Sequence, residues 1–342
     1  MIFINYGDKL THNTREILEA SDILQYLEKE MAVTLKPNLV VARPAEQGAT
    51  THPEIVEGVI LFLKDVGVKN ISVMEGSWVG DSTKSAFKKC GYDNLKKRYG
   101  VNLVDLKDDK AIKKNDLNIC QSIMPPQTEF LINIPVLKAH CQTLLTCCLK
   151  NLKGCIPDAE KRRFHAMGLH KPIAALNKII PTGYCVVDSI CGDLTYEEGG
   201  NPVQSNRIIA GRNPWAIDAY CATLIGYKPE EIGYLEGAVC TEEIRELNVE
   251  QKPKISTKGN PVSRQYVGLV EEKSACSACY ASLMFALQRL KNPKQIGKIY
   301  IGQGFRGVSG KGVGIGNCTS QFERYIKGCP PKALDIVAQL KN

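Results

Sequence analysis

Short, mostly apolar runs recur along the first two thirds of the chain, and helix-like segments separate them. The two most apolar runs end in a polar residue or a proline. Runs of this kind are typical of parallel strands that helices cover on both faces. The pattern predicts strands over Val33–Lys36, Ile71–Met74, Val101–Asp105, Phe130–Pro135 and Tyr184–Asp188.

The clearest helix signal follows the first of these strands. Pro53 suits the first turn of a helix, Thr51 or His52 precedes it as a cap, and Gly67 lies just beyond the end, so we expect a helix over Pro53–Asp65. Further helices are predicted over Gln142–Lys150, Ile173–Ile179 and Trp215–Ile225. The alternation predicts a layered α/β fold with a mostly parallel sheet.

A second, smaller unit is expected at the C-terminus. The chain turns polar between about Asn248 and Lys273, where prolines and glycines interrupt any periodicity. We therefore predict an α/β domain over residues 1–250, a linker over 251–272, and a small metal-binding α/β domain over 273–342. In that domain we expect helices over Ala281–Leu290, over Phe322–Lys327 and after Pro331, with a strand over Lys298–Ile301.

Seven glycines fall between Gly302 and Gly316. The backbone amides of such a stretch could hold an anion or bond to cluster sulfurs. It lacks the Gly-Lys-Ser/Thr ending of a phosphate-binding loop, so no nucleotide is predicted. We favour the simpler interpretation, a loop that crosses over a metal site.

Composition narrows the class of protein. The 342 residues are 44% hydrophobic and 23% charged, as in ordinary soluble proteins. No apolar run is long enough to span a bilayer, and the N-terminus does not resemble a signal peptide, so we expect a cytoplasmic protein without a membrane partner. The net charge of +8 includes only two short basic runs without interleaved aromatic residues, and we expect no nucleic-acid partner. Fourteen cysteines in such a chain indicate a reducing, anaerobic cytosol.

Four cysteines near the C-terminus form the most informative motif. Cys276 and Cys279 are separated by two residues, Cys318 follows after 38 more, and Cys329 stands before two prolines. Thiolates at such spacing bind a soft metal centre, either zinc or an iron–sulfur cluster. Only one pair is close, and a Cys-Pro step recurs in cluster-binding runs, so we expect one 4Fe–4S cluster. The alternatives are a zinc ion and four buried thiols without a metal.

A basic segment of the main domain is the second candidate site. Residues 136–172 carry seven Lys or Arg against two Asp or Glu. Lys138 and His140 come just after a predicted buried strand, and ligands of open α/β sheets bind at the carboxyl ends of strands. Lysines and histidines there would suit a carboxylate or a phosphate. A solvated basic face would give the same composition.

Acidic residues could enter the same crevice. Asp188 and Asp193 lie around the end of a predicted strand, Asp218 lies early in a helix, and Glu197 and Glu198 form a predicted turn. The five-residue spacing of the histidines at 165 and 170 does not suit a two-histidine metal site. No hydrolase motif is present.

Ordered motifs over approximately residues 30–235 resemble the domain-of-unknown-function family 362. They are Lys36-Pro-Asn38, Thr51-His-Pro-Glu54, Ile134–His140, Leu149–Gly154, Lys161–His165, Val186–Asp188, Glu198–Pro202 and Asn213–Asp218. Members are often described as iron–sulfur proteins, and many carry a ferredoxin-like cysteine module. This chain has the dispersed C-terminal set instead of a compact cysteine run.

The resemblance implies a set of site residues within the crevice. We assign catalytic roles to Lys138, His140, His165 and Asp188, and substrate-binding roles to Lys36, Asn38, Lys150, Asn151, Lys153 and Asp218. His140 or His165 is the expected proton donor, because histidine titrates nearest neutral pH.

These inferences lead to a functional hypothesis with two alternatives. We expect a redox enzyme in which a 4Fe–4S cluster exchanges electrons with an anionic small molecule and with a partner protein such as a ferredoxin or a flavoprotein. The alternatives are a non-catalytic electron carrier or cluster-bearing partner protein, and a zinc-stapled protein with non-redox chemistry. Since the cysteines lie 100 residues or more from the crevice, the redox hypothesis requires the C-terminal domain to fold back over it.

Overall fold

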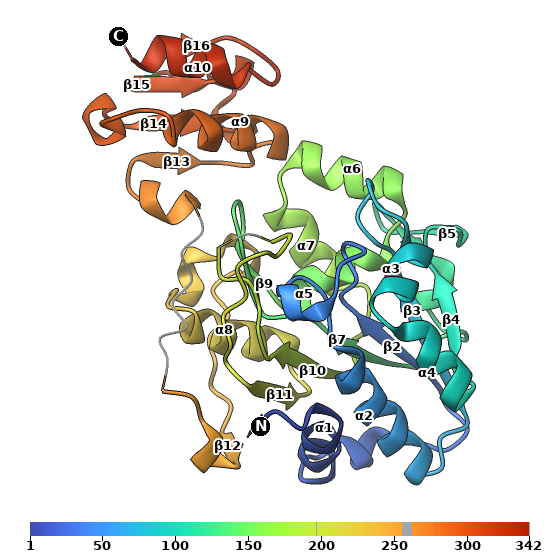
Figure 1. Ribbon diagram of the computed structural model, residues 1–342. Coiled ribbons are helices and arrows are strands. Elements are labelled where there is room, and N and C mark those ends of the chain that lie inside the picture. The colour runs from blue at the N-terminus through green and yellow to red at the C-terminus, as the bar shows by residue number, and fades with distance from the viewer. Residues whose placement is uncertain (196, 255–261, 342) are drawn as a thin grey trace.

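An eight-stranded mixed sheet forms the centre of the computed structural model, which describes residues 1–195, 197–254 and 262–341 (Figure 1). The strand order is β12-β1-β11-β10-β7-β2-β3-β4, and only β11 runs antiparallel to its neighbours. The strands are β1 (Ile2–Tyr6), β2 (Ala32–Pro37), β3 (Asn70–Glu75), β4 (Asn102–Asp105), β7 (Phe130–Ile134), β10 (Tyr184–Ser189), β11 (Arg207–Gly211) and β12 (Ile244–Leu247). The predicted α/β class with a mostly parallel sheet is confirmed.

Helices cover both faces of this sheet, as the apolar runs predicted. In β10, Tyr184 and Val186 belong to one hydrophobic core, whereas Cys185 and Val187 belong to the other. The helices on one face are α1 (Leu10–Glu19), α2 (Pro53–Asp65), α3 (Thr83–Lys89) and α4 (Tyr92–Tyr99). The helices on the other face are α5 (Cys148–Asn151), α6 (Asp158–Met167), α7 (His170–Asn177) and α8 (Pro214–Leu224). Because side chains alternate along a strand, both sets of residues are buried.

Two small hairpins stand outside the main sheet: β5 (Ala111–Lys114) with β6 (Leu117–Cys120), and β8 (Lys138–His140) with β9 (Leu144–Thr146). The second hairpin contradicts the helix predicted over Gln142–Lys150. Leu144 has a positive φ of 64° and pairs with His140, so a helix starts only at Cys148.

The C-terminal residues form a separate four-stranded parallel sheet in the order β13-β14-β15-β16. Its elements are β13 (Val270–Glu272), α9 (Ser277–Leu287), β14 (Ile299–Ile301), β15 (Gly310–Ile315), β16 (Phe322–Ile326) and α10 (Ala333–Leu340). A hydrophobic core of its own joins the two helices to the sheet. The expected small C-terminal α/β unit is therefore present.

Several details of this unit differ from the prediction. Phe322 and Ile326 are both buried at a helix-like spacing of four, but the segment pairs with β15 as an edge strand. Six residues of the glycine-rich stretch, Gly310–Ile315, form strand β15 rather than loop, and Gly314 allows Thr319 to pack directly against it. β13 lies inside the predicted linker, of which residues 255–261 fall outside the described residues.

Candidate functional site

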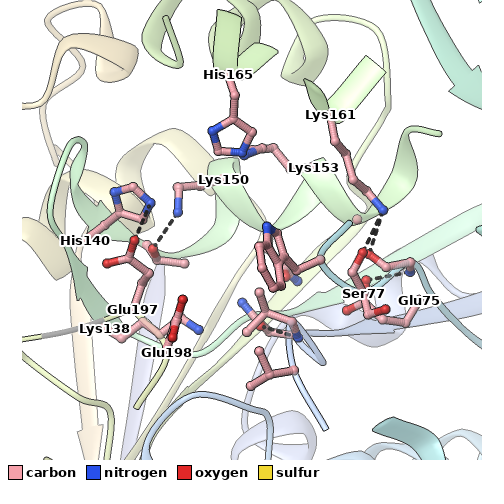
Figure 2. A pocket seen from close by; sticks show the side chains of 18 residues that line it. Glu75, Ser77, Lys138, His140, Lys150, Lys153, Lys161, His165, Glu197 and Glu198 are labelled. Atoms are coloured by element: carbon pink, nitrogen blue, oxygen red, sulfur yellow. Dashed lines mark hydrogen bonds and ion pairs between the residues drawn. The ribbon is translucent and has the colours of Figure 1, made fainter. Parts of the chain in front are cut away.

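A pocket opens at the carboxyl ends of the parallel strands β2, β3 and β7, where sequence reasoning placed the crevice (Figure 2). It encloses about 840 Å³ of empty space, including its mouth. The β8–β9 hairpin and helices α5 and α6 supply most of its polar wall. Its polar lining includes Asn38, Glu75, Ser77, Lys138, His140, Lys150, Asn151, Lys153, Lys161, His165, Glu197 and Glu198.

Three lysines in this wall lack a carboxylate within ion-pair distance among the described residues: Lys138, Lys150 and Lys153. The Lys138 ammonium donates to the carbonyl of Ala49 at 2.6 Å, and that of Lys150 donates to Oγ1 of Thr146 at 3.1 Å. Lys138 is buried, whereas Lys150 and Lys153 are half-buried, and the Glu197 carboxylate is an opposite charge that acts on all three. A cation held away from water is costly unless an anion compensates it.

The pKa values of these lysines are lowered, because burial disfavours the charged form of each side chain. Burial, with repulsion from Lys150, lowers the pKa of Lys138 from 10.5 to about 7. Burial likewise lowers the pKa of Lys150 to about 8, and the pKa of Lys153 lies well below its usual value. A bound anion would favour the charged forms and raise all three pKa values.

His140 is fixed as a neutral hydrogen-bond donor. Its Nδ1 accepts the backbone N–H groups of Gln142 and Thr143, both at 3.1 Å, so the ring proton resides on Nε2, 3.5 Å from Glu197. Burial lowers the pKa of His140 well below its usual value. The ring therefore points an N–H group into the pocket without carrying a charge.

His165 connects the pocket to the cysteine-bearing segment. The Lys153 ammonium donates to Nε2 of His165 at 3.0 Å, which leaves Nδ1–H to donate to Oγ of Ser277 at 2.8 Å. The Ser277 hydroxyl donates to Gln142 at 2.6 Å, and Gln142 in turn donates to the carbonyl of Ala275 at 2.9 Å. Since Ser277 lies between Cys276 and Cys279, the expected contact between the C-terminal unit and the crevice is confirmed.

Four cysteines gather at the carboxyl edge of the C-terminal sheet. Cys276 and Cys279 follow β13 at the start of α9, Cys318 follows β15, and Cys329 follows β16. The pKa of the Cys279 thiol reflects the proximity of the four cysteines. Burial and the other three thiols raise this pKa to about 11. Gly316 adjoins this group with a φ of 86°, a left-handed conformation that favours glycine.

No three of these four sulfurs lie close enough together in this structure to share one tetrahedral zinc ion. A tetrahedral zinc site places its sulfurs about 3.8 Å apart, as follows from the usual Zn–S bond length. Among the described residues, the groups of three ligand atoms lying within 4.8 Å of one another do not include these four cysteines. In a 4Fe–4S cluster each thiolate binds a different iron, so the four sulfurs lie farther apart than the sulfurs that bind a single metal ion.

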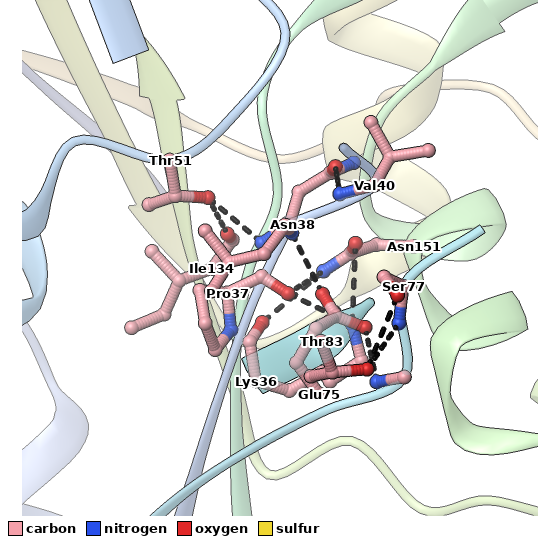
Figure 3. Close-up of polar contacts among 12 residues, drawn as sticks. Lys36, Pro37, Asn38, Val40, Thr51, Glu75, Ser77, Thr83, Ile134 and Asn151 are labelled. Carbon is pink, nitrogen blue, oxygen red and sulfur yellow. Dashed lines mark hydrogen bonds and ion pairs between the residues drawn. The ribbon is translucent and has the colours of Figure 1, made fainter. Parts of the chain in front are cut away.

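Lys36 lies behind the pocket wall in a buried polar network (Figure 3). Its ammonium pairs with Glu75 at 2.9 Å, and Asn151 donates to the backbone carbonyl of Lys36 at 3.1 Å. A Cβ on Gly154 would lie 2.2 Å from the Glu75 carboxylate, so only glycine fits there. Asn38 and Asn151 line the pocket, whereas Lys36 supports it through Glu75.

The pocket lies within a region of the chain that is similar to a known protein family. Residues 33–223 match the family model described as Domain of unknown function (DUF362). The chain belongs to the DUF362 family. The matched region contains the pocket lysines and both pocket histidines but none of the four C-terminal cysteines.

A curated relative shares part of this DUF362 chain. The thylakoid-associated protein sll1697 of Synechocystis sp. is 25% identical over 211 residues, which cover 58% of this chain. The match spans 64% of that protein, less than two thirds of its length. In the part of this chain that the structure describes, no helix is both long and apolar enough to cross a membrane.

Three predicted residues of the DUF362 region lie outside the pocket lining: Lys36, Asp188 and Asp218. Asp218 accepts the backbone N–H groups of Cys148 and Leu149 and so caps helix α5, which carries Lys150. Asp188 accepts from the backbone and ring of His52, both at 2.8 Å. In this geometry both carboxylates orient neighbouring elements of the site.

The DUF362 region also contains two compact groups that could hold a metal ion: His140 with Cys141 and Glu197, and Cys147 with Cys148 and Asp218. In the first, the two backbone donors at Nδ1 keep the His140 Nε2 atom protonated, which opposes metal binding there. In the second, the Cys147 and Cys148 sulfurs are 3.9 Å apart in the core. The adjacent cysteines at 147 and 148 were the sequence signal for this group.

Proposed function

We propose that this DUF362 protein is an iron–sulfur redox enzyme acting on an anionic small molecule. The observation that carries the proposal is the hydrogen-bond chain from Lys153 through His165 to Ser277, which joins an anion-seeking pocket to the segment bearing Cys276 and Cys279. Electron transfer between a metal centre held by these cysteines and a substrate in the pocket would need the two to lie close together.

The four C-terminal cysteines fit one 4Fe–4S cluster. They lie at one sheet edge, and no three of their sulfurs lie within 4.8 Å of one another, whereas one zinc ion would require them to approach more closely. A cluster bound there would supply one-electron transfer. The residues of the pocket would supply binding, orientation and protons.

The pocket lysines bind the anionic ligand in this proposal. Lys138, Lys150 and Lys153 provide the positive charge, and the Nε2–H group of His140 donates a hydrogen bond that orients the ligand. Because a lowered pKa makes an ammonium a better acid near neutral pH, Lys153 is a better proton donor than the neutral His140. His165 accepts from Lys153 and so holds that ammonium in position.

A paired experiment tests the two halves of the proposal. Protein purified without oxygen is analysed for iron and sulfide, and its affinity for inorganic phosphate and for citrate is measured by calorimetry. The K150M/K153M variant should retain its iron and sulfide but lose at least tenfold in anion affinity, whereas K113M, at an exposed lysine of β5, should match the wild type.

The anion-affinity measurement tests the pocket, and the metal analysis tests the redox assignment. Equal anion affinity in all three proteins would refute the pocket assignment. Stoichiometric zinc without sulfide would instead refute the redox assignment and favour the zinc-stapled alternative.

A further inference from the structure

Positive charge is concentrated at the C-terminus of this protein. Residues 273–342 contain eleven Lys or Arg and two Asp or Glu, a net charge of +9. The whole chain carries +8, so the preceding 272 residues carry −1. The excess charge therefore belongs to the unit that bears the four cysteines.

These cations face solvent. All eleven side chains are exposed, and among the described residues only Lys273 lies within ion-pair distance of a carboxylate, that of Glu271 at 3.1 Å. Charges on an exposed surface contribute little to folding. A surface with this much uncompensated charge instead steers the approach of an oppositely charged molecule.

Three of the cations stand at the same edge of the sheet as the cysteines. Arg306 follows β14 and interacts with Cys318, Lys327 ends the β16 segment, and Lys332 precedes α10. Cys329 is exposed between the last two. The cation-lined edge therefore surrounds the most accessible of the four thiols.

The opposite side of the cysteine group faces the main domain. The Cys276 thiol lies 2.9 Å from the carbonyl of Ala166 at the end of α6, and Ser277 bonds to His165 of the pocket wall. The cysteine group thus contacts α6 at Cys276, whereas Cys329 is exposed to solvent.

We propose that the surface formed by Arg306, Lys327 and Lys332 around Cys329 is the docking site for an acidic electron-transfer protein. The inference rests on the proposed redox function and assigns its partner surface. Charge complementarity determines the choice of an acidic partner. Because Cys329 is a proposed ligand of the cluster, a partner bound around it would be placed to exchange electrons. A nucleic acid would also be attracted by charge, but it has no reason to bind around a cysteine.

A charge-reversal experiment with a matched control tests the docking site. The K327E/K332E variant changes two cations beside Cys329, whereas K291E/K294E makes the same change in net charge beyond the far end of α9, a helix about 16 Å long. Binding of a fluorescently labelled plant-type ferredoxin, an acidic one-electron carrier, is measured by anisotropy at about 20 mM and about 200 mM salt.

The proposal predicts that K327E/K332E weakens ferredoxin binding at least tenfold, and that salt weakens wild-type binding by a similar factor. The control variant should change affinity less than twofold. Equal weakening in both variants, or in neither, would overturn the docking site. The docking site would also be overturned if the protein bound a single-stranded DNA oligomer more tightly than ferredoxin and the K327E/K332E variant lost that binding.

The same samples distinguish this proposal from the proposed function. Iron and sulfide content, together with bleaching of the visible absorption by dithionite, reports on the cluster independently of ferredoxin. Normal cluster content with no ferredoxin binding would refute the docking site alone. Absence of iron and sulfide would refute the redox function, and the docking inference that rests on it would then fail with it.

Discussion

Replacing Lys138 with methionine should stabilise the protein at mildly acidic pH while weakening anion binding. Lys138 is 2% exposed, and burial with repulsion from Lys150 lowers its pKa from 10.5 to about 7. At 1.36 kcal/mol for each tenfold change in proton affinity, the charged form costs about 5 kcal/mol in the folded protein. Methionine has a similar length and no charge, so it removes this cost.

The gain is partly offset by a lost hydrogen bond. Lys138 donates to the carbonyl of Ala49 at 2.6 Å, and leaving that carbonyl unpaired costs about 1–3 kcal/mol. The expected net stabilisation at pH 6 is therefore about 2–4 kcal/mol, which corresponds to a rise of several degrees in Tm.

The pH dependence follows from the direction of the shift. Below pH 7 Lys138 is protonated in both folded and unfolded states, so the full destabilisation is present. Above pH 7 the folded state loses this proton first, and the destabilisation disappears as the pH approaches 10.5. K138M should thus raise Tm at pH 6 and have little effect, or lower Tm slightly, at pH 10.

Thermal unfolding monitored by circular dichroism at both pH values provides the assay, with K113M as the exposed-lysine control. The affinity of K138M for inorganic phosphate, measured in parallel, should fall. A lower Tm for K138M than for the wild type at pH 6, or a stability difference independent of pH, would refute the reasoning about an unpaired buried charge.

Four further predictions follow from the same structure. K36M should destabilise the protein by about 3–5 kcal/mol in denaturant unfolding, because it leaves Glu75 buried without its cation, and an unchanged midpoint would contradict this. Phosphate affinity should fall as the pH rises through 8, where Lys150 loses its proton, so a flat calorimetric profile between pH 7 and 9 would count against the pocket. S277A should keep the iron content but speed amide hydrogen exchange at the start of α9, whereas unchanged exchange would show that the His165 contact is dispensable. C279S should lose most of its iron and sulfide, and full retention would remove that residue from the ligand set.

The sequence predicted the main sheet well because its strands are buried on both faces. Phe130–Pro135 and Tyr184–Asp188 are apolar runs too short for helices, and each lies in a strand of the sheet. The segment Phe322–Lys327 shows where this reasoning fails. Burial of Phe322 and Ile326 fits a helix or an edge strand equally well, and only pairing with β15 decides between them.

The site was predicted in part. Lys138 and His140 could be placed at the carboxyl end of a strand, and the family motifs added Lys150 and Lys153, all of which line the pocket. The partners of these residues could not be predicted, because contacts such as that of His165 with Ser277 join segments 112 residues apart. The substrate-binding role of Lys36 and the catalytic role of Asp188 stay predictions, although the structure pairs these residues with Glu75 and His52.

The central claim is that the four C-terminal cysteines hold an iron–sulfur cluster beside the anion pocket. Iron and acid-labile sulfide in protein purified without oxygen test it most directly, with the variant in which Cys276 and Cys279 are both serine as the control. We expect about four irons and about four sulfides per chain, both lost in the variant. One zinc per chain without sulfide, or no metal at all, would contradict it.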